Sequence, residues 1–362
     1  MNQDISQELQ QQVKEAITHQ QQLNIVAGNS KQFLGRLPQG ETLDIGKHTG
    51  IVNYEPVELV ITVRAGTRIK ELSDTLAEHG QMLAFEPPMY KGAATIGGTV
   101  AASSSGPGRP YLGSVRDYVL GVKMLNGQGE IVRFGGAVMK NVAGYDLSRL
   151  MVGAMGTLGI LLEVSLKVLP IHSRVLTTTK YVPEAEALEL MSRWAALSLP
   201  LTASFYSGNR LYFRLSGSGK AVDAAFEHIG GELLSEGCEH WASLREHTYR
   251  FFHAENSGDN PSRRLWRLSV PPTSVPIALK GKKIIEWGGA QHWLLSDEAP
   301  EIIFQACANI GGHASLFRGS ATDRAAEVYQ PLTPSLFALH QNIKRACDPH
   351  GIFNPGRLYA EL

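Results

Sequence analysis

Three short segments in the first half of the chain combine glycine with small hydroxyl or amide side chains, a composition suited to binding phosphate. They are 28–35 (GNSKQFLG), 94–99 (ATIGGT) and 156–160 (GTLGI). Glycine leaves backbone N–H groups uncovered and lets a ligand come close, so such segments can hold a diphosphate without a net positive charge. Any one of them alone is more often a simple turn. The three together predict one long anion-binding groove.

Two common nucleotide-binding motifs do not fit these residues. The G-x-G-x-x-G fingerprint needs a strand before it, a helix after it and an acidic residue about 20 residues later, and no glycine run here meets these conditions. Segment 216–220 (SGSGK) looks like the end of a P-loop, but Arg214 stands where the first glycine is required and Ala221 follows the lysine. We therefore expect a turn before a helix at 216–220.

The composition is that of a folded protein with more than one domain. Of the 362 residues, 43% are hydrophobic and 19% are charged, which provides enough apolar material for large cores. Lysine plus arginine equals aspartate plus glutamate at 34 each, so no net charge favours nucleic acid or an anionic membrane. No apolar run approaches the roughly 20 residues of a membrane span, and the N-terminus lacks the apolar region of a signal peptide. We expect a cytoplasmic protein with no membrane span of its own and no nucleic-acid partner.

The three cysteines, Cys238, Cys307 and Cys347, are odd in number and widely spaced. This pattern predicts buried free thiols in a reducing compartment rather than a disulfide framework. Three scattered cysteines also cannot supply the usual four ligands of an iron–sulfur cluster. The sequence indicates no metal site.

Hydrophobic periodicity predicts a mixed chain of helices and strands with a boundary near 170–174. The first half is predicted to contain helices at 5–17 and 68–79, a helical segment from 144, a hairpin of strands 119–125 and 130–134, and buried strands at 58–65 and 160–169. The second half is predicted to contain helices at 184–197, 221–229 and 335–347, and strands at 210–216, 264–270, 283–287, 292–295 and 313–318. The last helix is expected to turn Leu336, Leu339 and Ile343 inward. Segment 87–113 consists almost entirely of small residues and is expected to add nothing to a core.

The order and separation of four segments resemble the PCMH-type FAD-binding domain of the vanillyl-alcohol-oxidase family. The segments are GNSKQFLGR, PPMYKGAATIGGTVAASSSGPGRPYLGSVRDYVLG, KNVAGYDLSRLMVGAMGTLGILLEVSLKVLP and the terminal DPHGIFNPGR. Within this family the chain is most similar to the FAD-binding subunits of bacterial glycolate oxidase. The resemblance implies an α+β protein with a PCMH-type FAD-binding domain of two α/β subdomains at 1–171, an α+β cap domain for substrate or interaction at 172–333, and a C-terminal segment at 334–362 that returns to the FAD domain.

The resemblance also implies that FAD is the cofactor and binds in an extended form, with its phosphates on the first two segments and its isoalloxazine toward the cap. Ser30 stands where some relatives attach the flavin through a histidine, so noncovalent FAD is expected. Met155 stands where relatives often have a glutamate. The residues implied to bind FAD are Gly28, Asn29, Ser30, Lys31, Gly35, Pro87, Thr95, Ile96, Gly97, Gly98, Gly113, Ser114, Asp117, Gly156, Thr157, Gly159 and Ile160.

By the same resemblance, the chain would oxidise glycolate, a small 2-hydroxy acid, to glyoxylate. Its partners would be a paralogous FAD subunit and an iron–sulfur subunit that takes the electrons, and only these partners would bring it to a membrane. An arginine would hold the substrate carboxylate and a base would take the hydroxyl proton. The candidates are Arg214, Arg267 and Arg318 for the carboxylate, and His313 or Tyr212 for the base.

Two alternatives to this function stay open at the level of sequence. Catalytic 2-hydroxy-acid relatives have a histidine-rich pattern in the cap, where this chain has GGHASLFRGS with a single histidine. The chain could therefore be a non-catalytic subunit that carries FAD for assembly or electron transfer. It could also be a related FAD-dependent hydroxy-acid or aldonolactone oxidoreductase, because the cap determines substrate choice.

Overall fold

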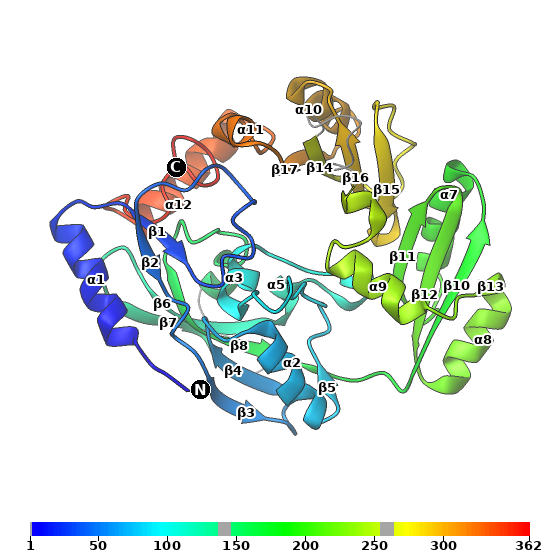
Figure 1. Cartoon of the computed structure of the whole chain (residues 1–362), viewed down its shortest axis with the longest axis horizontal. Coiled ribbons are helices and arrows are strands. Elements are labelled where there is room, and N and C mark those ends of the chain that lie inside the picture. Colours follow the sequence, from blue (N-terminus) through cyan, green and yellow to red (C-terminus); the bar gives the residue numbers. More distant parts are fainter. Residues whose placement is uncertain (1, 137–145, 254–263) are drawn as a thin grey trace.

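Two antiparallel sheets form the framework of the molecule (Figure 1). The computed structural model describes residues 2–136, 146–253 and 264–362. A five-stranded sheet comes from the first half of the chain and an eight-stranded sheet from the second. The mixed α and β character predicted from the sequence is confirmed.

The five-stranded sheet has the strand order β3-β4-β8-β6-β7. Its central strands β4 and β8 are apolar runs, and their side chains Ile61 and Leu162 are fully buried. The predicted hairpin is confirmed, since β6 and β7 pair in antiparallel fashion. In its turn, Asn126 Oδ1 accepts hydrogen bonds from the backbone N–H groups of Gln128 and Glu130. The strands are β3 (Ile51–Glu55), β4 (Val60–Arg64), β6 (Val119–Leu125), β7 (Ile131–Gly135) and β8 (Ile160–Lys167).

Helices α1 (Ser6–Thr18) and α2 (Ile69–Glu78) pack on the same core as this sheet. Both follow the apolar periodicity of the sequence, and α2 ends just before Gly80, whose φ of +64° suits a helix stop. The parallel pair β1 (Leu23–Val26) and β2 (Glu41–Asp44) lies at the edge of this core, and the first glycine segment follows β1 directly. A short pair, β5 (Gln81–Met82) and β9 (Leu169–Pro170), closes this half.

The small-residue segment 87–113 does contribute to the core, so the prediction that it would not is wrong. It contains α3 (Ile96–Ala101) and α4 (Arg109–Leu112), and Ile96 and Val100 are fully buried. These two apolar side chains can fill the core because Gly97, which has no Cβ, lets α3 closely approach Ala65, the residue after β4. Two more short helices follow, α5 (Val115–Tyr118) and α6 (Leu147–Leu150); the predicted start of the latter at 144 lies outside the described residues.

The eight-stranded sheet has the order β13-β10-β12-β11-β15-β16-β14-β17. Its long strands fall within a residue or two of the predicted ranges in 210–318, which confirms those predictions. The strands are β10 (Arg174–Tyr181), β11 (Leu201–Ser207), β12 (Arg210–Gly217), β13 (Glu232–Leu233), β14 (Arg264–Ser269), β15 (Lys282–Glu286), β16 (Gln291–Ser296) and β17 (His313–Arg318).

Alternate residues of these strands face two different sets of helices. One face packs on α7 (Glu184–Ala195), α8 (Gly219–Ile229) and α10 (Pro300–Ala308). The other face, which carries Phe205, Trp293 and Phe317, packs on α9 (Gly237–Arg245) and the short helix η1 (Arg250–His253). A second short helix, η2 (Trp287–Gly289), joins β15 to β16. The face that carries α9 also meets the first half of the chain.

The C-terminal segment lies beside β1, as Figure 1 shows at the upper left. It follows α11 (Ala321–Ala325) and α12 (Pro334–Cys347). The helix α12 is confirmed, and its predicted inward face holds in part: Ile343 packs on the core of the first half, whereas Leu336 and Leu339 are 45% and 51% exposed. The buried residue of α12 is Lys344, next to Ile343.

The cysteines form no disulfide in the described chain, as predicted. Their predicted burial holds only in part. Cys307 is a buried residue of α10, whereas Cys347 is half-buried and Cys238 is exposed.

Candidate functional site

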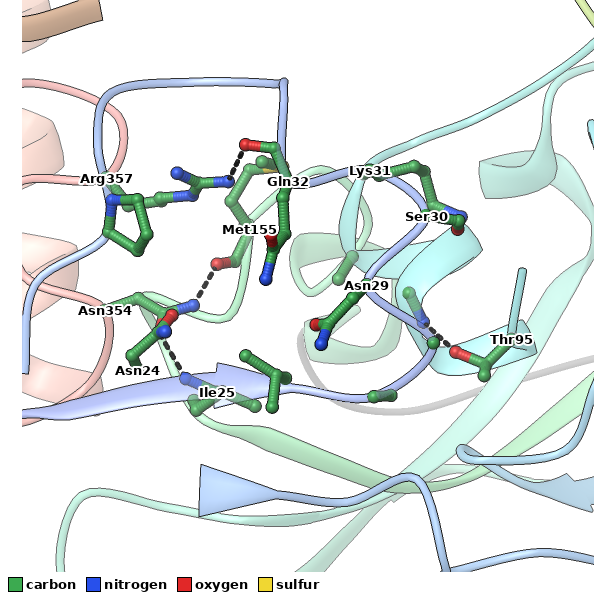
Figure 2. A pocket seen from close by; sticks show the side chains of 17 residues that line it. Asn24, Ile25, Asn29, Ser30, Lys31, Gln32, Thr95, Met155, Asn354 and Arg357 are labelled. Atoms are coloured by element: carbon green, nitrogen blue, oxygen red, sulfur yellow. Dashed lines mark hydrogen bonds between the residues drawn. The ribbon is translucent and has the colours of Figure 1, made fainter. Parts of the chain in front are cut away.

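A cavity opens where the first glycine segment, α3 and the C-terminal segment meet, and we call it the loop cavity. Figure 2 shows the side chains around it. Two of the three predicted glycine segments therefore share one cavity, and residue 155 brings the third to its edge. Its lining is 24–32, Pro38, Thr95, Gly98, Ala101, Ala102, Met155, Asn354 and Arg357.

The first segment forms a backbone turn suited to an anion. Asn29 has a φ of +53°, in the left-handed region that asparagine tolerates better than most residues. Among the described residues, no acceptor binds the backbone N–H groups of Asn29, Ser30 and Lys31. Unpaired N–H groups next to a left-handed residue are the usual structure of a phosphate-binding turn.

Lys31 supplies the positive charge of this turn. Its Nζ lies 3.2 Å from Ser30 Oγ and 5.4 Å from the centre of the Tyr90 ring. Burial lowers the pKa of this ammonium group to about 8, because the charged form has lost much of its water. An anion in the cavity would replace that water and stabilise the charge.

The second segment offers fewer free backbone N–H groups than its sequence suggests. The N–H groups of Ile96 and Gly97 already donate to Thr67 O and Ala65 O, at 2.9 and 2.8 Å. A Cβ on Gly97 would lie 2.6 Å from the Ala65 Cβ, so this glycine serves the packing of α3 on β4. Thr95 and Gly98 are the members that face the loop cavity.

The third segment lines a neighbouring cavity on the side of the five-stranded sheet, which we call the sheet cavity. Its lining is 25–27, Ile45, Gly97, Gly98, Ala101, Met151, 154–156, 159–161 and Asn354. Gly156 has a φ of +73°, and a Cβ there would lie 2.6 Å from Asn354 Nδ2. Thr157 does not face either cavity, since its hydroxyl is buried and donates to Ala154 O at 2.7 Å.

The C-terminal segment completes both cavities with residues that the sequence reasoning missed. The Asn354 side chain accepts from Ile25 N at 2.7 Å and donates to Met155 O at 2.6 Å, so one amide joins β1 to the third segment. The Arg357 guanidinium donates to Gln32 O and Arg36 O beside the first segment. The terminal segment DPHGIFNPGR was the available signal, but no local pattern gives the position of these side chains.

A buried lysine fixes this tail. Lys344 Nζ donates to Thr157 O, Phe353 O and Asp348 Oδ2, at 2.8, 2.8 and 2.7 Å. Asp348 is 2% exposed and also accepts from the backbone N–H groups of Ile352 and Phe353. Because each charge is neutralised and hydrogen-bonded, α12 holds the tail against the third glycine segment.

Two further cavities lead from the loop cavity toward the eight-stranded sheet. The interface cavity is lined by Leu34, Pro88, Tyr90, Ala102, 104–107, Leu244, Arg245, His247, Arg267, Glu286, Trp287, Gln291, Trp293 and Phe317. The outer cavity is lined by Ser30, 89–93, Glu239, Ala242, Ser243, 245–248, His253 and Arg318. Adjacent cavities share residues: Ala102 joins the loop and interface cavities, and Ser30 joins the loop and outer cavities. The four cavities thus lie next to one another between the five-stranded sheet and the eight-stranded one.

The interface cavity has strongly perturbed charged groups. Arg267 projects from β14, and burial lowers the pKa of its guanidinium; no hydrogen bond or ion pair to this group is found among the described residues. Glu286 on β15 accepts from Trp293 Nε1 at 2.7 Å and Gln291 Nε2 at 2.9 Å, and burial raises its pKa to about 7. Unpaired charge in a closed site is costly, so this cavity is built for a polar ligand.

Several predicted cofactor residues lie outside the four cavities. Gly35, Pro87 and Ile96 are buried in packing positions. Asp117 Oδ2 accepts from Ser114 N and Oγ, each at 2.8 Å, so this pair caps α5 next to Gly113. The predicted residues that do line the cavities are Gly28, Asn29, Ser30, Lys31, Thr95, Gly97, Gly98, Gly156, Gly159 and Ile160.

The predicted catalytic candidates are scattered. The Arg214 guanidinium is already bound to Glu86 at 2.6 Å and to Thr202, and it ties the two halves of the chain together. His313 is exposed at the start of β17, and Tyr212 stacks on His240 away from the cavities. Arg318 lines the outer cavity over the Phe33 ring, and Arg267 lies in the interface cavity.

The described residues contain no group of three or more histidine, cysteine, aspartate or glutamate side chains placed to hold a metal ion. No helix in this part of the chain is long and apolar enough to cross a membrane.

Comparisons with known proteins match both halves of the chain. Residues 5–135 match the FAD binding domain family, and residues 295–358 match the C-terminal domain of FAD linked oxidases. The chain is 46% identical to glycolate oxidase subunit GlcE of Escherichia coli, over 99% of both chains. It is 25% identical to glycolate oxidase subunit GlcD of Bacillus subtilis, over 89% of this chain and 80% of that one.

The fold has relatives among solved structures. One is p-cresol methylhydroxylase with substrate bound, which superposes with a TM-score of 0.72 at 17% identity over 99% of this chain and 88% of that one. This comparison identifies the fold as the PCMH type that the sequence resembles, with a cap after the FAD-binding half.

Proposed function

The chain belongs to the FAD-linked oxidase family and is an FAD-dependent oxidoreductase, and we propose that it is the FAD-binding subunit of a glycolate oxidase complex. In this proposal it oxidises glycolate to glyoxylate and passes the electrons through FAD to a partner iron–sulfur subunit. The support is its 46% identity to GlcE over almost the whole of both chains. The three cysteines of the chain are too few for a cluster of its own, which is why the proposal places the cluster in a partner.

The described residues fit an extended FAD. The uncovered N–H groups of Asn29 and Ser30, with the Lys31 ammonium, would hold the diphosphate in the loop cavity. The bound FAD would also pass Thr95, Gly98 and Asn354, where the protein backbone comes close to the cavity. When bound, FAD would accept the hydride that glycolate loses, and with it the two electrons of the oxidation.

The structural observation that carries the proposal is that the loop cavity and the interface cavity lie side by side and share Ala102. An extended dinucleotide in the loop cavity would reach the interface cavity past Ala102, and there it would meet the unpaired guanidinium of Arg267. A small carboxylate such as glycolate suits that position, because a guanidinium binds a carboxylate through two parallel hydrogen bonds. The cap strand β14 would then supply the substrate anchor and the first half of the chain the cofactor.

The test is to reconstitute the full chain with FAD and add glycolate without oxygen. We expect a yellow protein whose flavin absorbance bleaches, and no bleaching with acetate, which lacks the hydroxyl group. A chain that remains colourless after FAD addition would contradict the cofactor site, and a yellow chain that stays oxidised would contradict turnover on this subunit.

A second candidate function is an assembly or electron-transfer subunit whose flavin never meets substrate. It is favoured by one observation: the described residues offer no metal-binding cluster, and the only histidine of the GGHASLFRGS segment, His313, is exposed. Partner subunits, including a paralogous FAD subunit, would then bind glycolate. In either case we propose that partners account for any association with a membrane.

A further inference from the structure

His247 lies at the junction of the interface and outer cavities and takes an uncommon backbone conformation. It comes two residues after the end of α9 and has a φ of +53°. Non-glycine residues in this region cost on the order of 1 kcal/mol or more and are found where the surrounding structure holds them for a purpose. Its ring packs against Phe317 and Trp293, with centroids 5.1 and 5.3 Å away.

One ring nitrogen of His247 is engaged and the other is accessible. Nδ1 lies 3.3 Å from the hydroxyl of Tyr90, on the loop that follows Pro88. Nε2 makes no hydrogen bond among the described residues and is not one of the buried side-chain atoms without a partner, so it is open to the cavities. If Nδ1 carries the proton and donates it to the Tyr90 oxygen, Nε2 keeps a free lone pair.

The neighbouring residue fixes Tyr90 in place. The Glu246 carboxylate accepts the backbone N–H groups of Met89 and Tyr90, at 3.0 and 2.8 Å, and also binds Arg245 Nε at 2.8 Å. Burial raises the pKa of Tyr90, so its hydroxyl stays neutral. Consecutive residues of one turn thus hold the Tyr90 loop and present the histidine to the same cavity.

Burial, together with two arginines, keeps the His247 ring uncharged. Burial, then Arg318 on β17 and Arg267 on β14, lower the pKa of His247 to about 3, so the ring is neutral in the free chain. A carboxylate bound to Arg267 would cancel much of that repulsion and raise the pKa of the histidine. The anion that fills the site would therefore make the nearby base stronger.

We propose that His247 is the catalytic base that accepts the hydroxyl proton of the 2-hydroxy acid at Nε2, that Arg267 holds its carboxylate, and that Tyr90 is a positioning residue. This inference rests on the proposed function. The O–H bond of glycolate breaks as its proton moves to Nε2, and the C–H bond breaks as a hydride, which carries both electrons of that bond, passes to FAD. The carbon–oxygen double bond of glyoxylate forms, so two hydrogens and two electrons leave the substrate and are all accounted for.

The main test is anaerobic reduction of the FAD-loaded full chain by glycolate, followed in a stopped-flow instrument. His247→Gln should lower the rate at saturating glycolate by about 10²–10⁴-fold, while the glycolate Kd from flavin difference spectra changes little. Arg267→Met should instead raise that Kd by about 10–150-fold. Tyr90→Phe should slow reduction less and move the pH profile of the rate, which a purely structural role would not do.

His240→Gln is the matched control. His240 lies on α9, and burial lowers its pKa to about 4, but it stacks on Tyr212 and lines none of the four cavities. We expect its variant to be reduced like the wild type. A His247→Gln chain that binds FAD and is reduced at the wild-type rate overturns the proposal. So does a result in which Glu286→Gln slows flavin reduction and His247→Gln does not, because the base would then be Glu286.

A second measurement separates this inference from the proposed function. If glycolate does not reduce the wild-type flavin, the proposed turnover fails, and oxalate binding then decides the role of His247. Calorimetry in two buffers at about pH 5 should record proton uptake with oxalate in the wild type and none in His247→Gln. Oxalate binding without proton uptake, or no oxalate binding, overturns the inference.

Discussion

The charge on Lys31 should make FAD binding depend on pH in a predictable direction. Burial lowers the pKa of this ammonium group to about 8, so the free chain loses the charge as pH rises through that value. A diphosphate beside Nζ stabilises the charged form, so binding above pH 8 must take up a proton. Affinity for FAD should therefore be fully present below the pKa and decline above it.

The size of the effect follows from the titration. With a pKa of about 8, roughly 90% of Lys31 is charged at pH 7 and roughly 10% at pH 9. If the charged form binds, the apparent Kd for FAD rises about tenfold over this interval, which is about 1.4 kcal/mol. Lys31→Met removes a charged donor worth about 1.5–3 kcal/mol, so its Kd should be about 10–150-fold higher at pH 7 and nearly constant to pH 9.

The assay is a titration of the full chain with FAD, monitored by quenching of flavin fluorescence at several pH values. Lys47→Met provides the control, because Lys47 is an exposed lysine of the same half that lines none of the four cavities. A wild-type Kd that does not change between pH 7 and 9 would refute the reasoning. So would a Lys31→Met chain that keeps the tenfold rise.

The C-terminal tail, the second glycine segment and the flavin attachment each give one more prediction. Lys344→Met leaves the buried Asp348 carboxylate without its positively charged partner, so the free energy of unfolding from guanidinium titration should fall by about 3–5 kcal/mol. A loss below about 1 kcal/mol contradicts this role of Lys344. Gly97→Ala should lower the unfolding midpoint, because the new Cβ would lie 2.6 Å from the Cβ of Ala65, the residue after β4. Gly98→Ala should mainly weaken FAD binding, and equal unfolding midpoints for the two variants would argue against this. Since Ser30 cannot form a histidyl flavin bond, acid precipitation should leave all flavin in the supernatant, and a yellow pellet would mean covalent attachment.

Sequence patterns located the groove well where the signal is local. Glycine, small hydroxyl groups and a lysine mark segments that must turn tightly and leave backbone uncovered, and Lys31, Thr95, Gly98 and Gly156 do line the connected cavities. The same pattern cannot tell a glycine that faces a ligand from one that faces a neighbouring strand. Gly97 borders the sheet cavity, yet a Cβ on it would meet Ala65 just after β4, and only the position of α3 reveals this close contact.

The features that sequence reasoning missed depend on contacts between distant parts of the chain. Asn354 bridges β1 and the third glycine segment, across sequence separations of 329 and 199 residues. The inward face of α12 was predicted from Leu336, Leu339 and Ile343, of which only Ile343 packs on the core, and a buried ion pair at Lys344 holds the end of that helix. Hydrophobic periodicity carries no information about a buried lysine, so the predicted face was right only in part.

The cap residues were the hardest to predict because the cap carries no motif. Arg214 resembles a substrate anchor in sequence, yet it is used to join the two halves through Glu86. His247 follows an ordinary amphipathic helix, and its chemistry arises only where the Tyr90 loop and two cap strands meet it.

The most direct test of the central claim is a single anaerobic turnover of the full chain loaded with FAD, with flavin absorbance and glyoxylate measured in the same sample. The account predicts that glycolate bleaches the flavin and that one glyoxylate forms for each FAD reduced. Flavin that binds the chain but stays oxidised in the presence of saturating glycolate would contradict it.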